Sequence, residues 1–180
     1  MISEERLKEL AELLKIPQAE HPERLFAERR IKDTDLVVYD LGCGRHKTIP
    51  RAIGVDIKRV TDIRASIDCL PMIECGTVDV VISRHSLEHL IDPVKALREW
   101  YRILKPFGRI ILVLPDHEFI DTMDYRTGNG VHLHAYTRSS LANLVDALGL
   151  FVILEDATVI SGWTFGMVIE KGEQNDKQTH

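Results

Sequence analysis

A short apolar run that ends in two glycines constrains the fold of this chain more than any other stretch. The run reads Val37-Val38-Tyr39-Asp40-Leu41-Gly42-Cys43-Gly44. Its β-branched residues favour a strand buried on both faces, and the glycines allow a tight turn at the carboxyl end of that strand. Open α/β sheets bind their ligands at this edge. The run therefore predicts an α/β layer fold in which a nucleoside-bearing ligand approaches the main chain, with Asp40 placed to hold the loop or to meet a cation.

Further buried strands follow at short intervals. Ile53-Gly54-Val55-Asp56 predicts a strand that ends in a carboxylate, the position from which an acid accepts hydrogen bonds from both hydroxyls of a ribose. Residues 78–83 and 110–113 are rich in valine and isoleucine and predict two more buried strands. Two antiparallel closing strands are expected at 150–154 and 165–170.

The spacing of apolar residues predicts helices at both ends of the chain. Ser3 can cap a first helix, in which Leu7, Leu10, Ala11 and Leu14 recur at helical spacing. Further helices are expected over 94–104 and from Ser139 or Ser140 to Leu148, where Gly149 ends the helix. We expect a helical segment at 1–30, one domain at 31–171 and a disordered polar tail at 172–180.

Two connections are too short for the helices that usually join parallel strands. Only eight residues, including Pro50, separate Gly44 from Ile53, and few separate Asp56 from the next short strand near 62–65. We therefore expect both crossover helices to be missing and one face of the sheet to be short of cover. The amphipathic helix over residues 3–14 is the nearest apolar surface that could cover it, within its own subunit or in a homodimer.

The composition is that of one globular domain. The 180 residues are 44% hydrophobic and 28% charged. A formal net charge of −5 argues against a surface that neutralises many phosphates, so we do not expect nucleic acid as a partner. Basic residues around the first strand ends indicate either a solvated rim or a site for an anionic group of the substrate. They are Arg45, Lys47, Arg51, Lys58, Arg59 and Arg64.

The cysteines and the apolar segments bear on the compartment. Cys43, Cys69 and Cys75 form neither a metal-type pair nor an even disulfide set. The sequence contains no recognisable signal peptide and no apolar span of membrane length. We therefore expect a cytoplasmic protein without a membrane span.

The ordered series of motifs resembles the class I S-adenosylmethionine-dependent methyltransferases, in the branch that acts mostly on small molecules. Besides the two strand motifs above, the resemblance rests on Ile67-Asp68-Cys69-Leu70-Pro71, Leu87-Glu88-His89-Leu90 and Leu97-Arg98-Glu99-Trp100-Tyr101-Arg102-Ile103-Leu104-Lys105-Pro106-Phe107-Gly108-Arg109. It extends from about Leu36 to about Ile169. It implies a three-layer fold with a seven-stranded Rossmann-like sheet, mostly parallel, whose last strand is antiparallel and lies beside the fifth, and with fewer helices on one face.

The resemblance also implies which residues hold S-adenosylmethionine. Gly42, Cys43 and Gly44, with Asp40, would lie under the methionine and ribose. Asp56 would bind the ribose hydroxyls, with Ile57 beside it. Asp68 would bind the adenine amino group, Cys69 and Leu70 would flank the ring, and Arg84 would follow the fourth strand.

Methyl transfer from a sulfonium is an in-line displacement, so orientation and exclusion of water can supply most of the catalysis. If a base assists, the candidates are His85, His117, His132, His134 and Tyr136, any of which could equally be a surface hydrogen-bonding group. We expect transfer to oxygen or nitrogen of a small molecule. A nicotinamide oxidoreductase is disfavoured, since the glycine turn has no room for a following helix. A non-catalytic binding module or partner subunit of the same fold remains the alternative.

A divalent metal is a further expectation. His85, Glu88 and His89 have the i, i+3, i+4 spacing that places three ligands on one side of a helical turn. The place is similar to the E-x-x-E-H of ubiquinone-pathway O-methyltransferases and small-RNA 2′-O-methyltransferases, which implies His132, ahead of Tyr136-Thr137-Arg138, as a fourth ligand. Such a nitrogen-rich set would favour zinc, manganese or iron. Alternatively, Glu88 and His89 only brace the turn.

Overall fold

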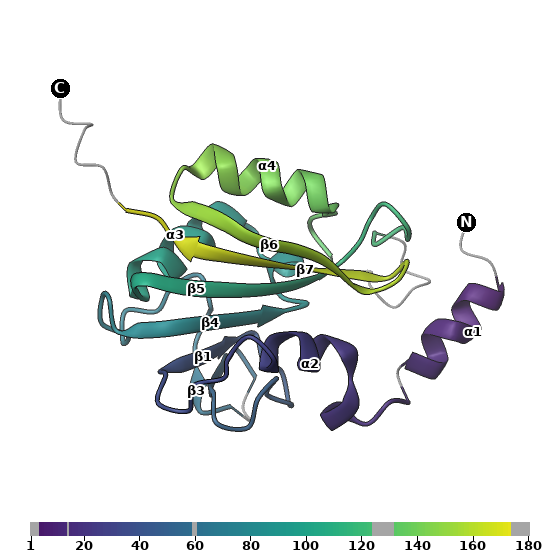
Figure 1. Ribbon diagram of the computed structural model, residues 1–180, viewed down its shortest axis with the longest axis horizontal. Coiled ribbons are helices and arrows are strands. Elements are labelled where there is room, and N and C mark those ends of the chain that lie inside the picture. The colour runs from purple at the N-terminus through teal and green to yellow at the C-terminus, as the bar shows by residue number, and fades with distance from the viewer. Residues whose placement is uncertain (1–3, 14, 59–60, 124–131, 174–180) are drawn as a thin grey trace.

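The computed structural model describes residues 4–13, 15–58, 61–123 and 132–173. Its centre is a seven-stranded sheet with the order β3-β2-β1-β4-β5-β7-β6 (Figure 1). The strands are β1 Val38–Leu41, β2 Ile53–Asp56, β3 Ile63–Arg64, β4 Val78–Arg84, β5 Leu104–Pro115, β6 Phe151–Ile160 and β7 Thr164–Lys171. β7 is the reversed strand of this sheet: it lies between β5 and β6 and runs antiparallel to both. The expected mostly parallel sheet with a reversed strand beside the fifth is confirmed.

The register of the parallel strands gathers the predicted ligand residues at one edge. Asp40 of β1 pairs with Gly54 of β2 on one side and with Ile82 of β4 on the other. The glycine loop, defined here as residues 42–44, therefore lies between the end of β2 and the end of β4. This is the edge at which an open parallel sheet binds its ligands.

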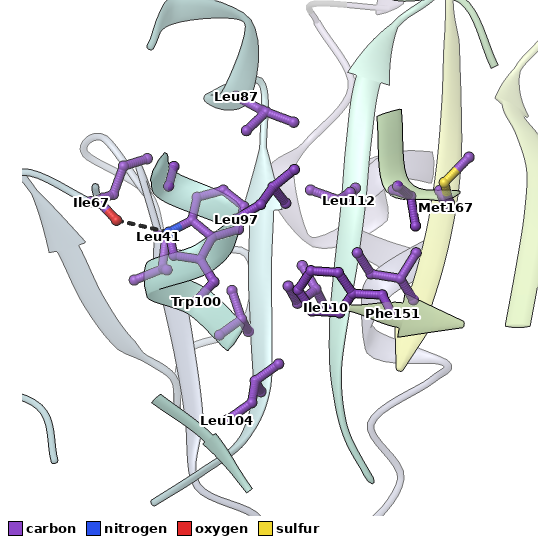
Figure 2. Packing of buried hydrophobic residues seen from close by; sticks show 14 of the residues in the cluster. Leu41, Ile67, Leu87, Leu97, Trp100, Leu104, Ile110, Leu112, Phe151 and Met167 are labelled. Atoms are coloured by element: carbon purple, nitrogen blue, oxygen red, sulfur yellow. Dashed lines mark hydrogen bonds between the residues drawn. The ribbon is translucent and has the colours of Figure 1, made fainter. Parts of the chain in front are cut away.

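One face of the sheet is covered by two helices, α3 (Pro93–Ile103) and α4 (Arg138–Leu148). Trp100 and Leu97 of α3 pack with Ile110 and Met167 of the sheet in the larger core cluster (Figure 2). Asp92 caps α3 by accepting from Lys95 N. The cap of α4 is Thr137 rather than Ser139 or Ser140, because the Thr137 side chain accepts from the third helical backbone N–H.

The opposite face is covered by a shorter helix, α2 (Pro22–Glu28). No helix joins β1 to β2, and the described part of the β2–β3 connection contains none, as expected. Phe26 of α2 packs on the sheet with Ile111 and Val168. A Cβ on Gly166 of β7 would lie 2.4 Å from the Phe26 ring, so glycine there lets the helix approach closely.

The expectation that the first helix covers this face within its own subunit is wrong, whereas the alternative that it does so in a homodimer stays a prediction. Figure 1 shows α1 (Glu4–Leu13) set apart from the sheet, while α2 lies on it. The reason is that α2 presents Glu23, Phe26 and Ala27 on one buried side, spaced i, i+3, i+4. An ion pair between Arg30 and Glu155 of β6 ties the end of α2 to the sheet. The predicted cap Ser3 and the last apolar residue, Leu14, lie outside the described residues.

Three boundaries differ from the predicted ones. β6 ends at Ile160 rather than at Leu154. β5 begins at Leu104 rather than near Ile110, with a register shift and a positive φ of 61° at Phe107 before its regular part. At the carboxyl end, Gly172 N donates to Leu150 O, so ordered structure continues one residue past β7. Residues 174–180 of the predicted tail lie outside the described residues. Within the described part of the chain, no helix has the length and apolar character needed to cross a membrane.

Candidate active site

The glycine loop is held against the turn that follows β4. Gly42 and Gly44 have positive φ values of 79° and 61°, which glycine adopts without strain. A Cβ on Gly42 would lie 2.1 Å from Ser86 Oγ, and that hydroxyl donates to Gly42 O. The close approach requires glycine at position 42, and it joins the loop to the turn carrying His85 and Glu88.

Asp40 directs one carboxylate oxygen at the loop and leaves the other without a partner. Its Oδ2 accepts from Thr48 N, and the residue is 1% exposed. Burial raises the pKa of Asp40, although the bond from Thr48 opposes this. Its Oδ1 has no hydrogen-bond partner among the described residues. Asp40 also lines the pocket beside the glycine loop, called here the main pocket. A cationic ligand group in that pocket would satisfy this oxygen.

Asp56 ends β2 beside the same loop. Its Oδ2 accepts from Gly44 N at 2.8 Å and its Oδ1 from Lys58 N at 2.9 Å. A carboxylate has about four lone-pair sites, so both oxygens keep capacity for further donors. The next side chain, Ile57, is 68% exposed and free to contact a ligand.

The predicted adenine residues lie on a turn next to Asp56, defined here as the adenine turn, residues 66–70. Ala65 N, just before it, donates to Asp56 O. Asp68 accepts hydrogen bonds from Ser66 Oγ and Lys95 Nζ. Both bonds lower the pKa of Asp68, and the bond from Ser66 has the larger effect. Cys69 is exposed, whereas Leu70 is fully buried, so the Leu70 side chain is part of the core. Neither Asp68 nor Cys69 lines the main pocket; they line a separate hollow beside α3.

The main pocket, named for its place at this edge of the sheet, has a volume of about 330 Å³ and is smaller than the hollow of about 670 Å³ between α2 and β6. It joins the glycine loop and the turn after β4 to the amino-terminal segment and to the β6–β7 connection. Its lining residues are Leu13, Gln18, His21, Glu23, Asp40, Gly42, Cys43, Thr48, Arg84, His85, His89, His132, Ile160 and Trp163. Sequence reasoning missed His21, Glu23 and Trp163, since no local motif marks them and only packing brings them to the site.

A buried ion pair connects the amino-terminal segment to this pocket. Glu23, 3% exposed, lies 2.8 Å from His85 Nε2, measured from its Oε1. Burial alone would raise the pKa of Glu23, but the charge and hydrogen bond of His85 and the charge of Arg84 lower it to about 2. Burial alone would lower the pKa of His85, but Glu23 and then Glu88 raise it to about 10. His85 is therefore a cation near neutral pH, held at a positive φ of 50°.

The state of His85 bears on two of its predicted roles. An imidazolium has no lone pair with which to accept a proton or bind a metal. Its Nε2 is bonded to Glu23, and its Nδ1 lies 3.5 Å from Glu88 Oε1. Both ring nitrogens of His85 thus face buried carboxylates, and His85 is not among the three described residues whose ligand atoms come close together. Its roles as base and as metal ligand stay predictions.

Glu88, His89 and His132 form a second cluster, of which the two histidines line the main pocket. Glu88 is 1% exposed, and neither of its side-chain oxygens has a hydrogen-bond partner among the described residues. His132 Nε2 lies 3.9 Å from Glu88 Oε1, and the rings of His89 and His132 are in edge contact at 4.6 Å between centroids. One ligand atom from each of the three lies within 4.8 Å of the others.

The protonation of His132 follows from its surroundings. Its Nδ1 lies 2.8 Å from the carbonyl oxygen of Thr122, which only accepts, so Nδ1 carries the proton. Burial is the main cause that lowers the pKa of His132, against the opposing charge of Glu88. The ring is thus neutral near pH 7, with a lone pair on Nε2.

Two of the other base candidates, His134 and His117, have hydrogen-bond partners, whereas the buried hydroxyl of Tyr136 has none among the described residues. His134 Nε2 lies 2.9 Å from Leu90 O, and His117 Nδ1 lies 3.0 Å from Thr122 Oγ1. Tyr136 is 7% exposed, and burial, with Glu88 as the second cause, raises its pKa to about 12. None of the three lines the main pocket. Of the three, His134 braces the turn after β4, where Leu90 O is its partner and Glu88 O accepts from the backbone of residues 133 and 134.

Most described members of the basic group have intramolecular partners. Lys47 pairs with Asp62 at 2.9 Å, and Arg64 Nε donates to Ile57 O. Arg51 donates to three carbonyl oxygens, those of Asp33, Thr34 and Leu36. These contacts favour a structural rim over a site for an anionic substrate group. Arg59 lies outside the described residues.

Comparison with known proteins agrees with this geometry. A family described as methyltransferase domain matches residues 8–155. The ubiquinone/menaquinone biosynthesis C-methyltransferase UbiE of Klebsiella pneumoniae is 34% identical over 91 residues, which are 50% of this chain and 35% of that protein. The match to curated relatives spans about a third of their length.

Solved structures share the fold. A Thermotoga maritima methyltransferase, titled a possible histamine N-methyltransferase, superposes with a TM-score of 0.70 at 16% identity, over 93% of this chain and 96% of that chain. The 1,6-didemethyltoxoflavin-N1-methyltransferase of Burkholderia thailandensis, with bound 1,6-didemethyltoxoflavin and S-adenosylhomocysteine, gives 0.69 at 16% identity, over 92% and 84%. The family match over most of the chain and the strand order together show that the chain belongs to the class I S-adenosylmethionine-dependent methyltransferases.

Proposed function

We propose that this protein transfers the methyl group of S-adenosylmethionine to an oxygen or nitrogen atom of a small molecule. The observation that carries the proposal is the pocket of about 330 Å³ that runs from the glycine loop to His89 and His132. The unpartnered Asp40 Oδ1 fits the cationic amino group of the methionine moiety, and the acceptor enters on the histidine side. The Burkholderia thailandensis enzyme, named for a small-molecule acceptor, supports the substrate class.

In this proposal the rest of the cofactor lies along the same strand edge. Asp56 accepts hydrogen bonds from the ribose hydroxyls while it continues to hold Gly44 N. Ile57, with its exposed side chain, and the backbone of Cys69 and Leu70 flank the adenine. Asp68 exchanges one of its present partners, Ser66 or Lys95, for the adenine amino group.

The reaction requires an acceptor lone pair in line with the methyl–sulfur bond. The acceptor forms a bond to the methyl carbon, the sulfur keeps the electron pair of the broken bond, and the acceptor releases a proton. His132 is the best placed of the predicted bases, because it lines the pocket and keeps a lone pair on Nε2. His85 and Arg84, paired with Glu23, form a charged wall that holds the pocket in shape.

Binding of a divalent metal ion is a second proposal for the cluster of Glu88, His89 and His132. It is favoured by one observation: among the described residues neither oxygen of the buried Glu88 has a hydrogen-bond partner, and Glu88 Oε1 lies 3.9 Å from Nε2 of the neutral His132. Glu88, His89 and His132 would bind the ion and leave a position for an acceptor hydroxyl, which the metal would acidify. This role excludes His132 as base, since one lone pair serves both.

The metal proposal is tested on protein purified without a histidine tag. Elemental analysis should find close to one zinc, manganese or iron per chain, and Glu88→Gln should lose it. Chelation followed by add-back should abolish and restore turnover. A metal-free protein with full turnover assigns the cluster to acid–base chemistry instead.

Turnover decides between an enzyme and a binding module. The purified protein, incubated with methyl-labelled S-adenosylmethionine and fractions of a metabolite extract, should transfer label to a small molecule. Product NMR then identifies the methylated atom, including carbon, the atom named for UbiE. Cofactor binding without transfer in any fraction would support the alternative of a binding module or partner subunit.

A structural neighbour from Haloferax volcanii was solved in complex with the Trm112 activator, so transfer that appears only after a partner is added is one outcome to examine.

Assembly is a separate proposal. We propose a homodimer as one assembly of the chain, and light scattering coupled to size exclusion measures it directly. A mass of about 20.5 kDa would show a monomer.

A further inference from the structure

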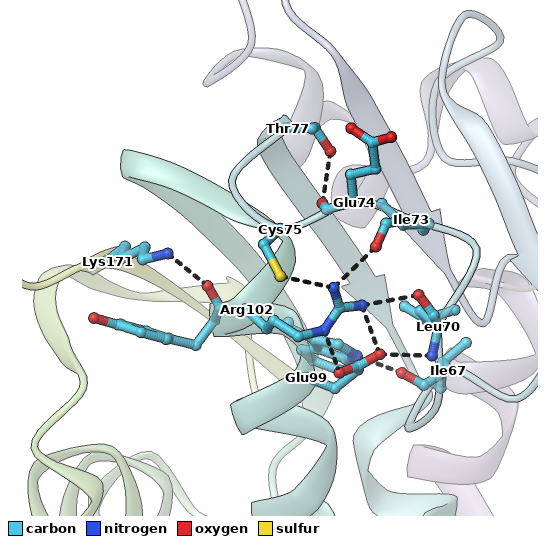
Figure 3. A network of polar contacts seen from close by, with 11 residues as sticks. Ile67, Leu70, Ile73, Glu74, Cys75, Thr77, Glu99, Arg102 and Lys171 are labelled. Atoms are coloured by element: carbon cyan, nitrogen blue, oxygen red, sulfur yellow. Dashed lines mark hydrogen bonds and ion pairs between the residues drawn. The ribbon is translucent and has the colours of Figure 1, made fainter.

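The adenine turn is fastened to α3 at three backbone atoms. Trp100 Nε1 donates to Ile67 O at 2.7 Å, Leu70 N donates to Glu99 Oε1 at 2.7 Å, and Arg102 Nη2 donates to Leu70 O at 2.8 Å (Figure 3). The three side chains come from neighbouring positions of one helix. A turn without regular secondary structure is thereby held at both of its ends.

The guanidinium of Arg102 is the centre of this arrangement. Its Nε and Nη2 donate to the two oxygens of Glu99 at 2.8 and 2.9 Å, and its Nη1 donates to Ile73 O at 2.9 Å and contacts Cys75 Sγ at 3.2 Å. These hydrogen bonds raise the pKa of Arg102, and the bond to Glu99 has the largest effect, so Arg102 stays charged. The planar guanidinium presents a fork of donors that reaches Glu99 and two separate carbonyl groups at once. The compact ammonium group of a lysine lacks this fork, so lysine cannot replace Arg102.

The other side of the adenine turn contacts the cofactor residues. Ala65 N donates to the carbonyl oxygen of Asp56, whose carboxylate holds the glycine loop. Ile67 Cδ1 lies 3.6 Å from the place where a Cβ on Gly42 would be. Trp100 is fully buried in the core, as Figure 2 shows with its bond to Ile67. The turn therefore lies between the rigid core and the edge where the cofactor is proposed to bind.

We propose that Glu99 and Arg102 are positioning residues for the cofactor: they fix the adenine turn so that the carboxylate of Asp68 and the backbone of Cys69 and Leu70 meet the adenine ring. The inference rests on the proposed cofactor contacts of this turn. Glu99 and Arg102 act only through the turn and touch no reacting atom. Binding affinity responds to sub-ångström displacement of such groups, because a misplaced acceptor loses its hydrogen bond while remaining desolvated.

The test measures binding of S-adenosylhomocysteine by calorimetry, well below the unfolding midpoint of each variant. Arg102→Lys should raise the Kd by about tenfold, whereas Arg109→Lys, at an exposed arginine that pairs with Glu170 away from the adenine turn, should leave it within about twofold. A second ligand, S-inosylhomocysteine, carries a keto oxygen in place of the adenine amino group. The preference of the wild type for the amino compound should shrink in Arg102→Lys, since it depends on the placement of Asp68.

A role in stability alone predicts a different result. It would lower the unfolding midpoint of Arg102→Lys and leave both the Kd and the base preference of the folded protein unchanged, which would overturn the inference. If Arg102→Lys does not fold, Glu99→Gln serves instead: it keeps an acceptor for Leu70 N but weakens the fork, and should raise the Kd by about threefold or more. A wild type that binds no S-adenosylhomocysteine would refute the proposed function itself, which is a separate outcome.

Discussion

The ion pair between Glu23 and His85 makes a quantitative prediction about stability and pH. The pKa of Glu23 falls from an ordinary value of 4.5 to about 2 in the folded protein. At about 1.4 kcal/mol per pH unit, this corresponds to about 3 kcal/mol of folding free energy. Since a domain of this kind is stable by only about 5–15 kcal/mol, the effect is large enough to measure.

The direction in which each pKa is shifted determines the pH range in which the ion pair stabilises the fold. Glu23 has a lowered pKa, so its stabilisation is present above about pH 4.5 and is lost as the pH falls toward about 2. His85 has a raised pKa, so its stabilisation is present below about pH 6.5 and is lost as the pH rises toward about 10. The two pKa shifts report the same ion pair, so their contributions to the folding free energy are not added. The contribution of the pair is therefore greatest between about pH 4.5 and 6.5.

Urea unfolding followed by circular dichroism, repeated across this pH range, measures the effect. Glu23→Gln should lower the free energy of unfolding by about 3 kcal/mol near pH 5.5, and the difference from wild type should narrow toward pH 2 and toward pH 10. The matched control is Glu28→Gln on the same helix, whose exposed carboxylate only approaches Arg24 at 3.8 Å and should change little. A difference between wild type and Glu23→Gln that stays constant with pH would show that the pair does not carry a buried charge interaction.

Three further outcomes are expected. Asp56→Ala should weaken binding of S-adenosylhomocysteine by about 1–3 kcal/mol in calorimetry, and unchanged affinity would remove the ribose assignment. Gly166→Ala should destabilise the fold by about 1–3 kcal/mol in urea unfolding, because its Cβ would meet the Phe26 ring at 2.4 Å; a neutral result would mean that α2 can shift freely. Phe26→Ala should lower stability by about 3–5 kcal/mol, whereas deletion of residues 1–13 should leave the unfolding midpoint nearly unchanged, and the reverse order would restore α1 as the cover of the sheet.

Much of the architecture was determined by short-range features of the sequence. The apolar, β-branched run before Gly42 favours a buried strand and forms β1, and Gly149 ends α4 in the left-handed conformation that glycine favours, with φ 62°. The missing helix between Gly44 and Ile53 follows from counting residues, because no crossover helix fits in that length. These conclusions depend only on neighbours in the chain, which the sequence shows directly.

The site depended on contacts that no local pattern encodes. Glu23 meets His85 across 62 positions of the chain, and that contact turns a predicted base into a cation. The choice of α2 over α1 as the cover of the sheet depends on how Phe26 fits against Gly166, a complementarity of shape between distant residues. Protonation and burial are set by the dielectric surroundings and charges that folding assembles, so only the tertiary structure could decide them.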